Sequence, residues 1–142
     1  MNRRKILVMG LPGAGKTTLA RMLASQLNAV FFNADELRKH INKDLSFSLE
    51  DRIEQARRMG WLCDRVVDTG AIAIADFVCP TAETRKAFGE AFIVWVDRIQ
   101  KCRFEDTNSL FSPPKDYHVR IPFDRSPADS AAKVFSIWKS AI

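Results

Sequence analysis

The chain has 142 residues, of which 46% are hydrophobic and 27% are charged, with a formal net charge of +5. This composition predicts one globular domain over residues 1–142, and basic residues spread along the chain argue against a nucleic-acid partner. No apolar run approaches the roughly 18 residues of a membrane-spanning helix, and the first apolar run is too short for a signal sequence.

The first element is a short apolar run, Lys5–Met9, which is typical of a buried strand. Residues 10–17 follow it and read GLPGAGKT, which fits the phosphate-binding pattern G-x-x-x-x-G-K-T. Apolar residues at helical spacing come next and predict a helix that runs to about Leu27. A strand, a glycine-rich loop and a helix in this order favour a site for a nucleoside triphosphate.

Each part of this loop has an expected role in binding ATP. Backbone N–H groups would surround phosphate oxygens, and the positive end of the helix dipole would attract them. Lys16 would reach the β- and γ-phosphates, and the Thr17 hydroxyl would ligate Mg²⁺. A glycine-rich turn that only caps a helix would leave Lys16 unexplained. The residues expected to bind ATP are Gly10, Leu11, Pro12, Gly13, Ala14, Gly15, Lys16, Thr17 and Thr18.

Beyond the loop, short apolar runs alternate with helical patterns, which predicts an α/β fold with a mostly parallel central sheet. The further strand candidates are 29–32, 71–75, 91–96 and, with a weaker pattern, 118–121. Expected helices run from Ala34 to about Ile41, from Ser48 to before Gly70, from Pro80 toward Phe88, and over Ala128–Ala141.

The helix after Ser48 is expected to open with a capping box made by Ser48 and Asp51. Its apolar face would be Ile53, Ala56, Gly60, Cys63 and Val67. The tryptophans Trp61, Trp95 and Trp138 are assigned to the core, and His40 and His118 to structural roles.

The polar segment from Glu105 to Pro114 predicts a loop within a mobile lid at residues 104–117. Arg103, just before it, could contact ATP, whereas Lys101 is expected to face solvent.

Ligands of open α/β sheets bind at the carboxyl ends of the strands. Charged side chains at several strand ends suit phosphoryl transfer, which needs Mg²⁺ ligation, a carboxylate for the acceptor hydroxyl and cations for the moving phosphoryl group. The residues that follow the second, third and fourth strand candidates include Asn33, Asp35, Arg38, Asp76, Phe77, Asp97 and Arg98.

Residues 31–60 resemble the adenylylsulfate kinase family, whose pattern here is D-G-D-N-x-R-x-G-L-N-x-D-L-G-F-S-x-x-D-R-x-E-N-x-R-R. The matching positions are Asp35, Arg38, Asn42, Asp44, Leu45, Phe47, Ser48, Asp51, Arg52, Glu54, Arg57 and Arg58. The resemblance continues through residues 76–80, where the family has S-F-I-S-P, and weakly through residues 106–111, where it has D-P-K-G-L-Y.

The resemblance implies a P-loop NTPase fold of the nucleotide-kinase type, with three layers and strand order 2-3-1-4-5. It also implies an ATP-dependent kinase that transfers the γ-phosphoryl group to the 3′-hydroxyl of adenylyl sulfate. Mg²⁺ would be the metal, the substrate a small anionic nucleotide, and a homodimer one expected assembly.

Lys16 and Asp35 are the expected catalytic residues. Asp35 would accept or orient the acceptor hydroxyl proton, although it could instead cap its helix. Arg38 and Arg52 would hold the acceptor's anion, or could be solvated helix arginines. By resemblance Phe47 would stack on the acceptor's adenine; the alternative is a hydrophobic staple.

The remaining acceptor candidates are less specific. Gln55 stands where the family has a substrate-contacting asparagine, but a plain surface glutamine is the alternative. Asp76 and Phe77 are expected in the same site, with Asp76 as a metal-water or acceptor contact or a satisfied strand-end carboxylate. Phe111 or Phe123 could form a second aromatic wall.

Three departures from the family pattern bear on the acceptor. Asn33 stands at the first carboxylate, Gln55 at an asparagine, and Asn108 at the lysine of the lid. Two alternatives therefore stay open. One is a kinase for another hydroxyl acceptor, such as a nucleoside, a nucleotide or a polynucleotide 5′-end. The other is an ATP-binding protein without catalysis.

The chain has three cysteines, Cys63, Cys79 and Cys102, whose spacing fits neither a C-x-x-C pair nor a zinc site. We expect reduced thiols in a cytoplasmic protein that has no membrane partner.

Overall fold

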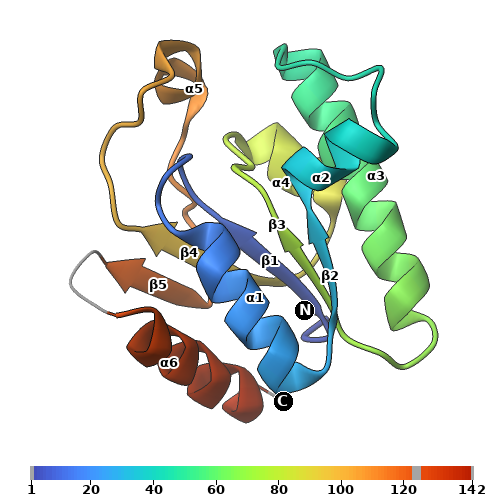
Figure 1. Ribbon diagram of the computed structural model, residues 1–142, viewed down its shortest axis with the longest axis vertical. Coiled ribbons are helices and arrows are strands. Elements are labelled where there is room, and N and C mark those ends of the chain that lie inside the picture. Colours follow the sequence, from blue (N-terminus) through green and yellow to red (C-terminus); the bar gives the residue numbers. More distant parts are fainter. Residues whose placement is uncertain (1, 123–125, 142) are drawn as a thin grey trace.

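The computed structural model describes residues 2–122 and 126–141, so Phe123 lies outside the described residues. Five parallel strands form one sheet in the order β2-β3-β1-β4-β5. This confirms the predicted fold class and strand order (Figure 1). The strands are β1 (Lys5–Met9), β2 (Val30–Asn33), β3 (Ala73–Asp76), β4 (Phe92–Asp97) and β5 (Val119–Pro122).

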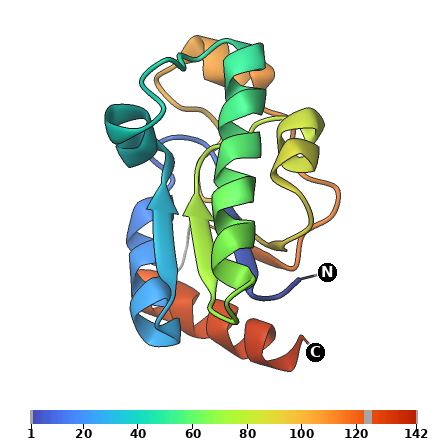
Figure 2. The same cartoon turned by 90° about the vertical axis from the view of Figure 1, so that its right-hand side faces the viewer.

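Helices cover both faces of the sheet, which gives three layers. One face is covered by α1 and α6, and the other by α3 and α4 (Figures 1 and 2). The helices are α1 (Lys16–Leu27), α2 (Ala34–His40), α3 (Leu49–Val67), α4 (Ala82–Phe88), α5 (Glu105–Leu110) and α6 (Pro127–Ser140).

The continuous apolar sequence of β1 follows from its central position. Ile6 and Val8 pack in the core beneath α1 and α6, while Leu7 and Met9 pack in the core beneath α3 and α4. All four side chains are at most 1% exposed, because a strand covered on both faces has no solvent side. The buried centre of the sheet therefore holds the loop after β1 in a fixed place.

Helix starts follow the predicted capping residues with one difference. Ser48 Oγ accepts a hydrogen bond from the Asp51 N–H at 3.1 Å and caps α3 as expected. The Asp51 carboxylate does not complete the box, since its Oδ2 accepts bonds from the backbone and hydroxyl of Ser46 instead. The complete capping box belongs to α4, where Thr81 and Thr84 bond each other reciprocally.

The buried face of α3 differs from the prediction. Trp61 is 53% exposed and stacks beneath Arg65, so its assignment to the core was wrong. Ile53 is only half-buried, whereas the polar residues Arg52 and Gln55 are buried. The first turns of α3 line a cavity that also holds charged side chains such as Asp35 and Arg38, and this is why polar side chains take the inward positions there.

The segment expected to be a loop contains α5, Glu105–Leu110, so that expectation was wrong in part. The helix was missed because it is short and its residues give no apolar periodicity.

Within residues 2–122 and 126–141, no helix is long and apolar enough to cross a lipid bilayer.

Candidate active site

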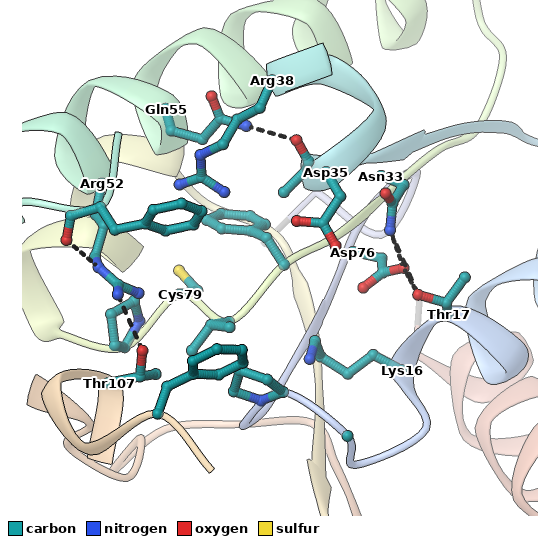
Figure 3. Close-up of a pocket in the computed structure, with 18 of the residues that line it drawn as sticks. Lys16, Thr17, Asn33, Asp35, Arg38, Arg52, Gln55, Asp76, Cys79 and Thr107 are labelled. Atoms are coloured by element: carbon teal, nitrogen blue, oxygen red, sulfur yellow. Dashed lines mark hydrogen bonds between the residues drawn. The ribbon is translucent and has the colours of Figure 1, made fainter. Parts of the chain in front are cut away.

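A cavity of about 650 Å³ lies at the carboxyl ends of the strands, between the phosphate loop and the helices α2, α3 and α5 (Figure 3). It collects nearly all residues that the sequence suggested for the site. Those in its lining are Pro12, Gly13, Gly15, Lys16, Thr17, Thr18, Asp35, Arg38, Phe47, Arg52, Gln55, Asp76 and Phe77. Gly10, Leu11 and Ala14 belong to the same loop but are buried and are not in the lining.

The phosphate loop depends on glycine at two places. Gly10 has φ +152°, and a Cβ there would collide with the carbonyl oxygen of Val96. Gly15 has φ +92° and stands at the N-cap of α1, where it leaves the first helical N–H groups facing the cavity. The loop therefore has the backbone of an anion-binding site.

Lys16 crosses the inside of the loop and donates a hydrogen bond from Nζ to the Leu11 carbonyl at 3.1 Å. Burial lowers the pKa of Lys16, while the carboxylates of Asp76 and Asp35 act to raise it. The ammonium thus lies close to both carboxylates and within the loop that would surround phosphate.

Thr17, Asp76 and Asn33 form one hydrogen-bonded group beside Lys16 (Figure 3). Thr17 Oγ1 donates to Asp76 Oδ2 at 2.8 Å, and Asn33 Nδ2 donates to the same oxygen at 3.0 Å. Asp76 is 2% exposed, and burial raises its pKa, with the bonds from Asn33 and Thr17 opposing that change.

This group offers hard oxygen ligands, which suit Mg²⁺. Among the described residues no three His, Cys, Asp or Glu side chains gather into a metal cluster. Mg²⁺ is commonly held by one or two carboxylates together with substrate phosphates, so Thr17 and Asp76 fit a metal that arrives with a nucleotide.

Asp35 does not cap its helix. Asn33 is the N-cap of α2, since its Oδ1 accepts a hydrogen bond from the Glu36 N–H at 3.0 Å. Asp35 lies in the first turn, and its carboxylate points into the cavity toward Asp76 and Lys16 (Figure 3). The carboxylate is therefore available to an acceptor.

Arg38, Phe47 and Arg52 cluster on the side of the cavity opposite the phosphate loop. The guanidinium carbon of Arg38 lies 4.4 Å from the centroid of the Phe47 ring, and that of Arg52 lies 5.5 Å away. The staple alternative would place an apolar partner at the fourth helical position, but that residue is Arg52. Phe47 is 54% exposed and has two cationic neighbours.

The two arginines differ in how far their donors are satisfied. Arg52 donates to the Phe47 carbonyl at 2.8 Å and to Thr107 Oγ1 at 3.0 Å, and lies 3.6 Å from the Asp106 carboxylate. Arg38 Nε is buried and has no hydrogen-bond partner among the described residues. Burial and the charge of Arg52 lower the pKa of Arg38. Arg38 is thus the donor that an incoming anion would satisfy.

Gln55 is not a surface glutamine, because it is 1% exposed. Its Oε1 accepts from Asn42 Nδ2 at 2.7 Å, and its Nε2 donates to the Ala34 carbonyl at 3.2 Å. The bond to Ala34 joins α3 to the first residue of α2, directly before Asp35, and the bond from Asn42 joins α3 to the segment that follows α2.

The segment at 104–117 is fastened to the rest of the site by side chains. Asn108 bonds both the N–H and the carbonyl of Cys102, each at 2.8 Å, so it closes the turn before α5. Arg85 donates to the carbonyls of Cys79 and Ser112, each at 3.0 Å. The residue that replaces the family's lysine therefore has a structural role here.

Sequence reasoning missed several residues of the lining, among them Cys79 and Thr107. Cys79 follows β3, where its position after Asp76 and Phe77 could have indicated it. Its φ is +50°, and burial raises the pKa of its thiol to about 12. Thr107 carries no sequence signal, because its role comes from the distant Arg52.

The structure also places four other residues named from the sequence. Asp97 pairs with Arg120 at 2.8 Å and is not part of the cavity lining. Phe111 packs on the apolar core beneath α3 and α4, and is likewise not in the lining. Lys101 is exposed as predicted, and Arg103 does line the cavity.

A protein-family model described as adenylylsulphate kinase matches residues 3–120 of the chain. The chain is 36% identical over 118 residues to adenylyl-sulfate kinase 3 of Arabidopsis thaliana, covering 75% of this chain and 57% of the plant protein. It is 34% identical over 123 residues to the adenylyl-sulfate kinase of Synechococcus sp. (strain JA-3-3Ab), covering 78% and 70% respectively. The chain thus spans 57% of the length of the plant relative and 70% of the length of the Synechococcus relative.

Among solved structures, the fold is similar to that of the Mycobacterium tuberculosis APS kinase CysC in complex with AMPPNP and APS. The TM-score is 0.87 at 24% sequence identity, and the match covers 96% of this chain and 98% of the other. At this identity the likeness shows the fold.

Proposed function

The chain belongs to the adenylylsulphate kinase family, and from that premise we propose that it transfers the γ-phosphoryl group of ATP to the 3′-hydroxyl of adenylyl sulfate. The main support for the proposal is that one cavity has two chemically different sides. The phosphate loop with Lys16 and Thr17 forms one side, and Arg38 with Phe47 forms the other. Asp35 and Asp76 lie between them (Figure 3).

The acceptor side suits a nucleotide that carries an anion. Phe47 offers an exposed ring on which a base can stack. Arg38, beside that ring, has a buried donor that finds no partner in residues 2–122 and 126–141, and a guanidinium fork matches the oxygens of a phosphate or sulfate. Adenylyl sulfate has an adenine, a phosphate and a sulfate, so it can use both groups. The solved relative in complex with AMPPNP and APS supports the same pair of ligands.

The reaction needs one bond to form and one to break. The acceptor's 3′-oxygen bonds to the γ-phosphorus, and the bond from that phosphorus to the β–γ bridging oxygen breaks. Asp35 would accept the proton of the 3′-hydroxyl, since its carboxylate faces the cavity and no capping bond occupies it. Lys16 would exchange the Leu11 carbonyl for phosphate oxygens and balance their charge.

We propose ATP and Mg²⁺ as the donor pair, with Thr17 as metal ligand. When bound, Mg²⁺ would neutralise charge on the β- and γ-phosphates. We propose that residues 104–117, part of which lines the cavity, form a lid over the acceptor.

A homodimer is proposed, supported by the exposed apolar side chains of Leu49 and Trp61 on α3. A cytoplasmic location is supported by three free, buried cysteines.

An acceptor screen tests the proposal. ADP formation from Mg-ATP is measured with adenylyl sulfate, nucleosides, nucleotides and 5′-hydroxyl oligonucleotides, each added alone. We expect only adenylyl sulfate to stimulate ADP formation strongly. Lys16→Ala should lose at least about 10²-fold in rate, while Lys101→Ala, which removes an exposed lysine, should not. If only another alcohol stimulates ADP formation, that alcohol and not adenylyl sulfate is the acceptor. If no compound stimulates ADP formation although the chain binds ATP, the chain is an ATP-binding protein without catalysis.

A further inference from the structure

Phe47 lies in a connecting segment, residues 41–48, which joins α2 to α3 (Figure 1). The segment presents the Phe47 ring to the Arg38 guanidinium, whose carbon lies 4.4 Å from the ring centroid. Within the segment, the Leu45 N–H donates to the Asn42 carbonyl at 3.1 Å, which closes one short turn. A turn of this length does not fix the ring, so the contacts of the segment with α3 decide where Phe47 stands.

Arg58, on α3, holds the beginning of this connecting segment. Its Nη1 and Nη2 donate to Asp44 Oδ1 and Oδ2, each at 2.9 Å, and Nη1 also donates to Asn42 Oδ1 at 3.2 Å. Two parallel bonds to one carboxylate fix the orientation of both groups as well as their distance. The Arg58 Nε donates to Glu54 Oε2 at 2.8 Å, so a neighbour on the same helix keeps the guanidinium in place.

The end of the segment is held by the first turn of α3. Asp51 Oδ2 accepts bonds from the N–H and the hydroxyl of Ser46, each at 2.9 Å, and Arg52 Nε donates to the Phe47 carbonyl at 2.8 Å. These partners are at most five residues apart in sequence, whereas Arg58 lies 14 residues from Asp44. The bonds of Arg58 therefore close the whole segment against α3.

We propose that Arg58 is a positioning residue of the acceptor site. By holding Asn42 and Asp44 against α3, it sets the Phe47 ring beside Arg38, where the base of the acceptor stacks. The inference rests on the proposed function insofar as it takes adenylyl sulfate as the acceptor. Arg58 is not in the cavity lining within the described part of the chain, so it acts on the acceptor through the segment and not by contact.

The network around Asn42 separates binding of the acceptor from catalysis. Asn42 is 2% exposed, and its Nδ2 donates to Gln55 Oε1 at 2.7 Å. Gln55 Nε2 donates in turn to the carbonyl of Ala34, which precedes Asp35. Neither bond involves Arg58, so Asp35 keeps this support when Arg58 is replaced. The loss of Arg58 should therefore act on the KM for the acceptor and not on kcat.

The same geometry separates placement of the ring from stability of the fold. The side chain of Arg58 is 29% exposed and that of Asp44 is 62% exposed. Exposed ion pairs contribute little to the free energy of unfolding, because water screens the charges. We expect variants of this pair to fold and to melt close to wild type, while the connecting segment loosens.

Hydrogen–deuterium exchange of the full chain without nucleotides tests the placement itself. In Arg58→Gln the amides of residues 41–48, including that of Ser46, should exchange about fivefold faster or more, because local opening becomes easier. Amides in the strands should not change. Arg57→Gln is the matched control, since Arg57 bonds the same Glu54 at 2.7 Å but is 58% exposed, and its side-chain bonds within the described residues go to Glu54.

Steady-state kinetics tests the consequence for the acceptor. Arg58→Gln should raise the KM for adenylyl sulfate about five- to tenfold and leave kcat and the KM for ATP within about twofold of wild type. Arg57→Gln should leave all three within about twofold. In a Phe47→Ala chain, Arg58→Gln should raise the KM by less than about twofold, because no ring remains to be placed. A role in stability alone would act equally in both backgrounds.

Unchanged exchange of the connecting segment in Arg58→Gln would overturn the inference, and so would an equal rise in KM in the Phe47→Ala chain. A normal KM for adenylyl sulfate in Arg58→Gln would overturn the inference and leave the proposed function intact. Faster exchange of the segment in Arg58→Gln, in a chain whose wild type does not turn over adenylyl sulfate, would remove the proposed acceptor. It would still support Arg58 as the residue that places Phe47, because the exchange experiment contains no acceptor.

Discussion

Arg52 Nη2 donates a hydrogen bond to Thr107 Oγ1 at 3.0 Å, across 55 residues of sequence. Arg52 belongs to α3 and contacts the ring of Phe47, whereas Thr107 lies in α5. The bond is buried, and it joins the acceptor side of the cavity to the segment at 104–117. A change in the position of α5 would therefore alter the surroundings of Phe47.

Thr107→Val removes this bond with little change in shape. We expect the KM for adenylyl sulfate to rise by about 3- to 10-fold, since a typical hydrogen bond contributes about 0.5–1.5 kcal/mol. The KM for ATP should stay the same, because Arg52 is not part of the phosphate loop. Ser109→Ala, an exposed position on the same helix, is the control for steady-state kinetics. Equal effects on both substrates would show that α5 does not act through the acceptor side.

Asp35→Asn keeps the shape of the side chain and removes its charge. We expect kcat to fall by about 10²-fold or more, the scale of general base catalysis, with ATP binding retained. The melting temperature should stay near that of wild type, because the cap of α2 is Asn33 and not Asp35. Glu36→Gln removes the neighbouring exposed carboxylate and should leave kcat unchanged. Loss of stability with normal kcat in Asp35→Asn would point to a structural role.

Phe47→Ala should weaken binding of adenylyl sulfate by about 1–3 kcal/mol, the range for base–aromatic stacking. ATP affinity should change little, because Phe47 lies opposite the phosphate loop. Isothermal titration with each nucleotide measures both affinities. Trp61→Ala, which removes an exposed aromatic ring outside the cavity lining, is the matched control. If Phe47→Ala leaves the affinity for adenylyl sulfate unchanged, the base of the acceptor does not stack on Phe47.

Asp76 should make the metal-free protein less stable as the pH rises. Burial raises the pKa of Asp76, so the folded state binds its proton more tightly than the unfolded state does. Below the pKa of the unfolded state, about 3.9, Asp76 is protonated in both states and its charge does not affect stability. Above the raised pKa of the folded state, the buried charge lowers the free energy of unfolding by its full amount. In EDTA, Asp76→Asn should melt above wild type near neutral pH, and the difference should vanish toward about pH 4.

Thermal unfolding at a series of pH values measures this difference. Asp97→Asn should show no such gain, because Asp97 loses its ion pair with Arg120. A lower melting temperature for Asp76→Asn at neutral pH would mean that the hydrogen bonds from Thr17 and Asn33 outweigh the burial of the charge.

The sheet could be predicted from the sequence because strands buried on both faces are continuous apolar runs, as in Lys5–Met9. The site could be predicted because parallel strands bring their carboxyl ends to one edge, which joins Thr17 to Asp76 across 59 residues. The choice of cap could not be predicted. Asn33 and Asp35 are both good capping residues, and only the backbone decides which one precedes the first helical turn.

Contacts between polar side chains far apart in the sequence could not be predicted either. The short helix α5 has no apolar period, so neither its existence nor the bond from Arg52 to Thr107 followed from any pattern. The exposure of Trp61 depends on which side of α3 faces the sheet, and a tryptophan among apolar residues does not reveal that. Residue type predicted the chemistry of the site better than it predicted the partner of each side chain.

The position of the transferred phosphoryl group decides whether the chain phosphorylates the 3′-hydroxyl of adenylyl sulfate. The purified chain is incubated with Mg-ATP and adenylyl sulfate, and ³¹P NMR identifies the product. We expect a new phosphate monoester on the 3′-oxygen of adenylyl sulfate, formed by wild type and not by Lys16→Ala. A phosphoryl group found on any other oxygen, or ATP consumed with release of inorganic phosphate alone, would contradict it.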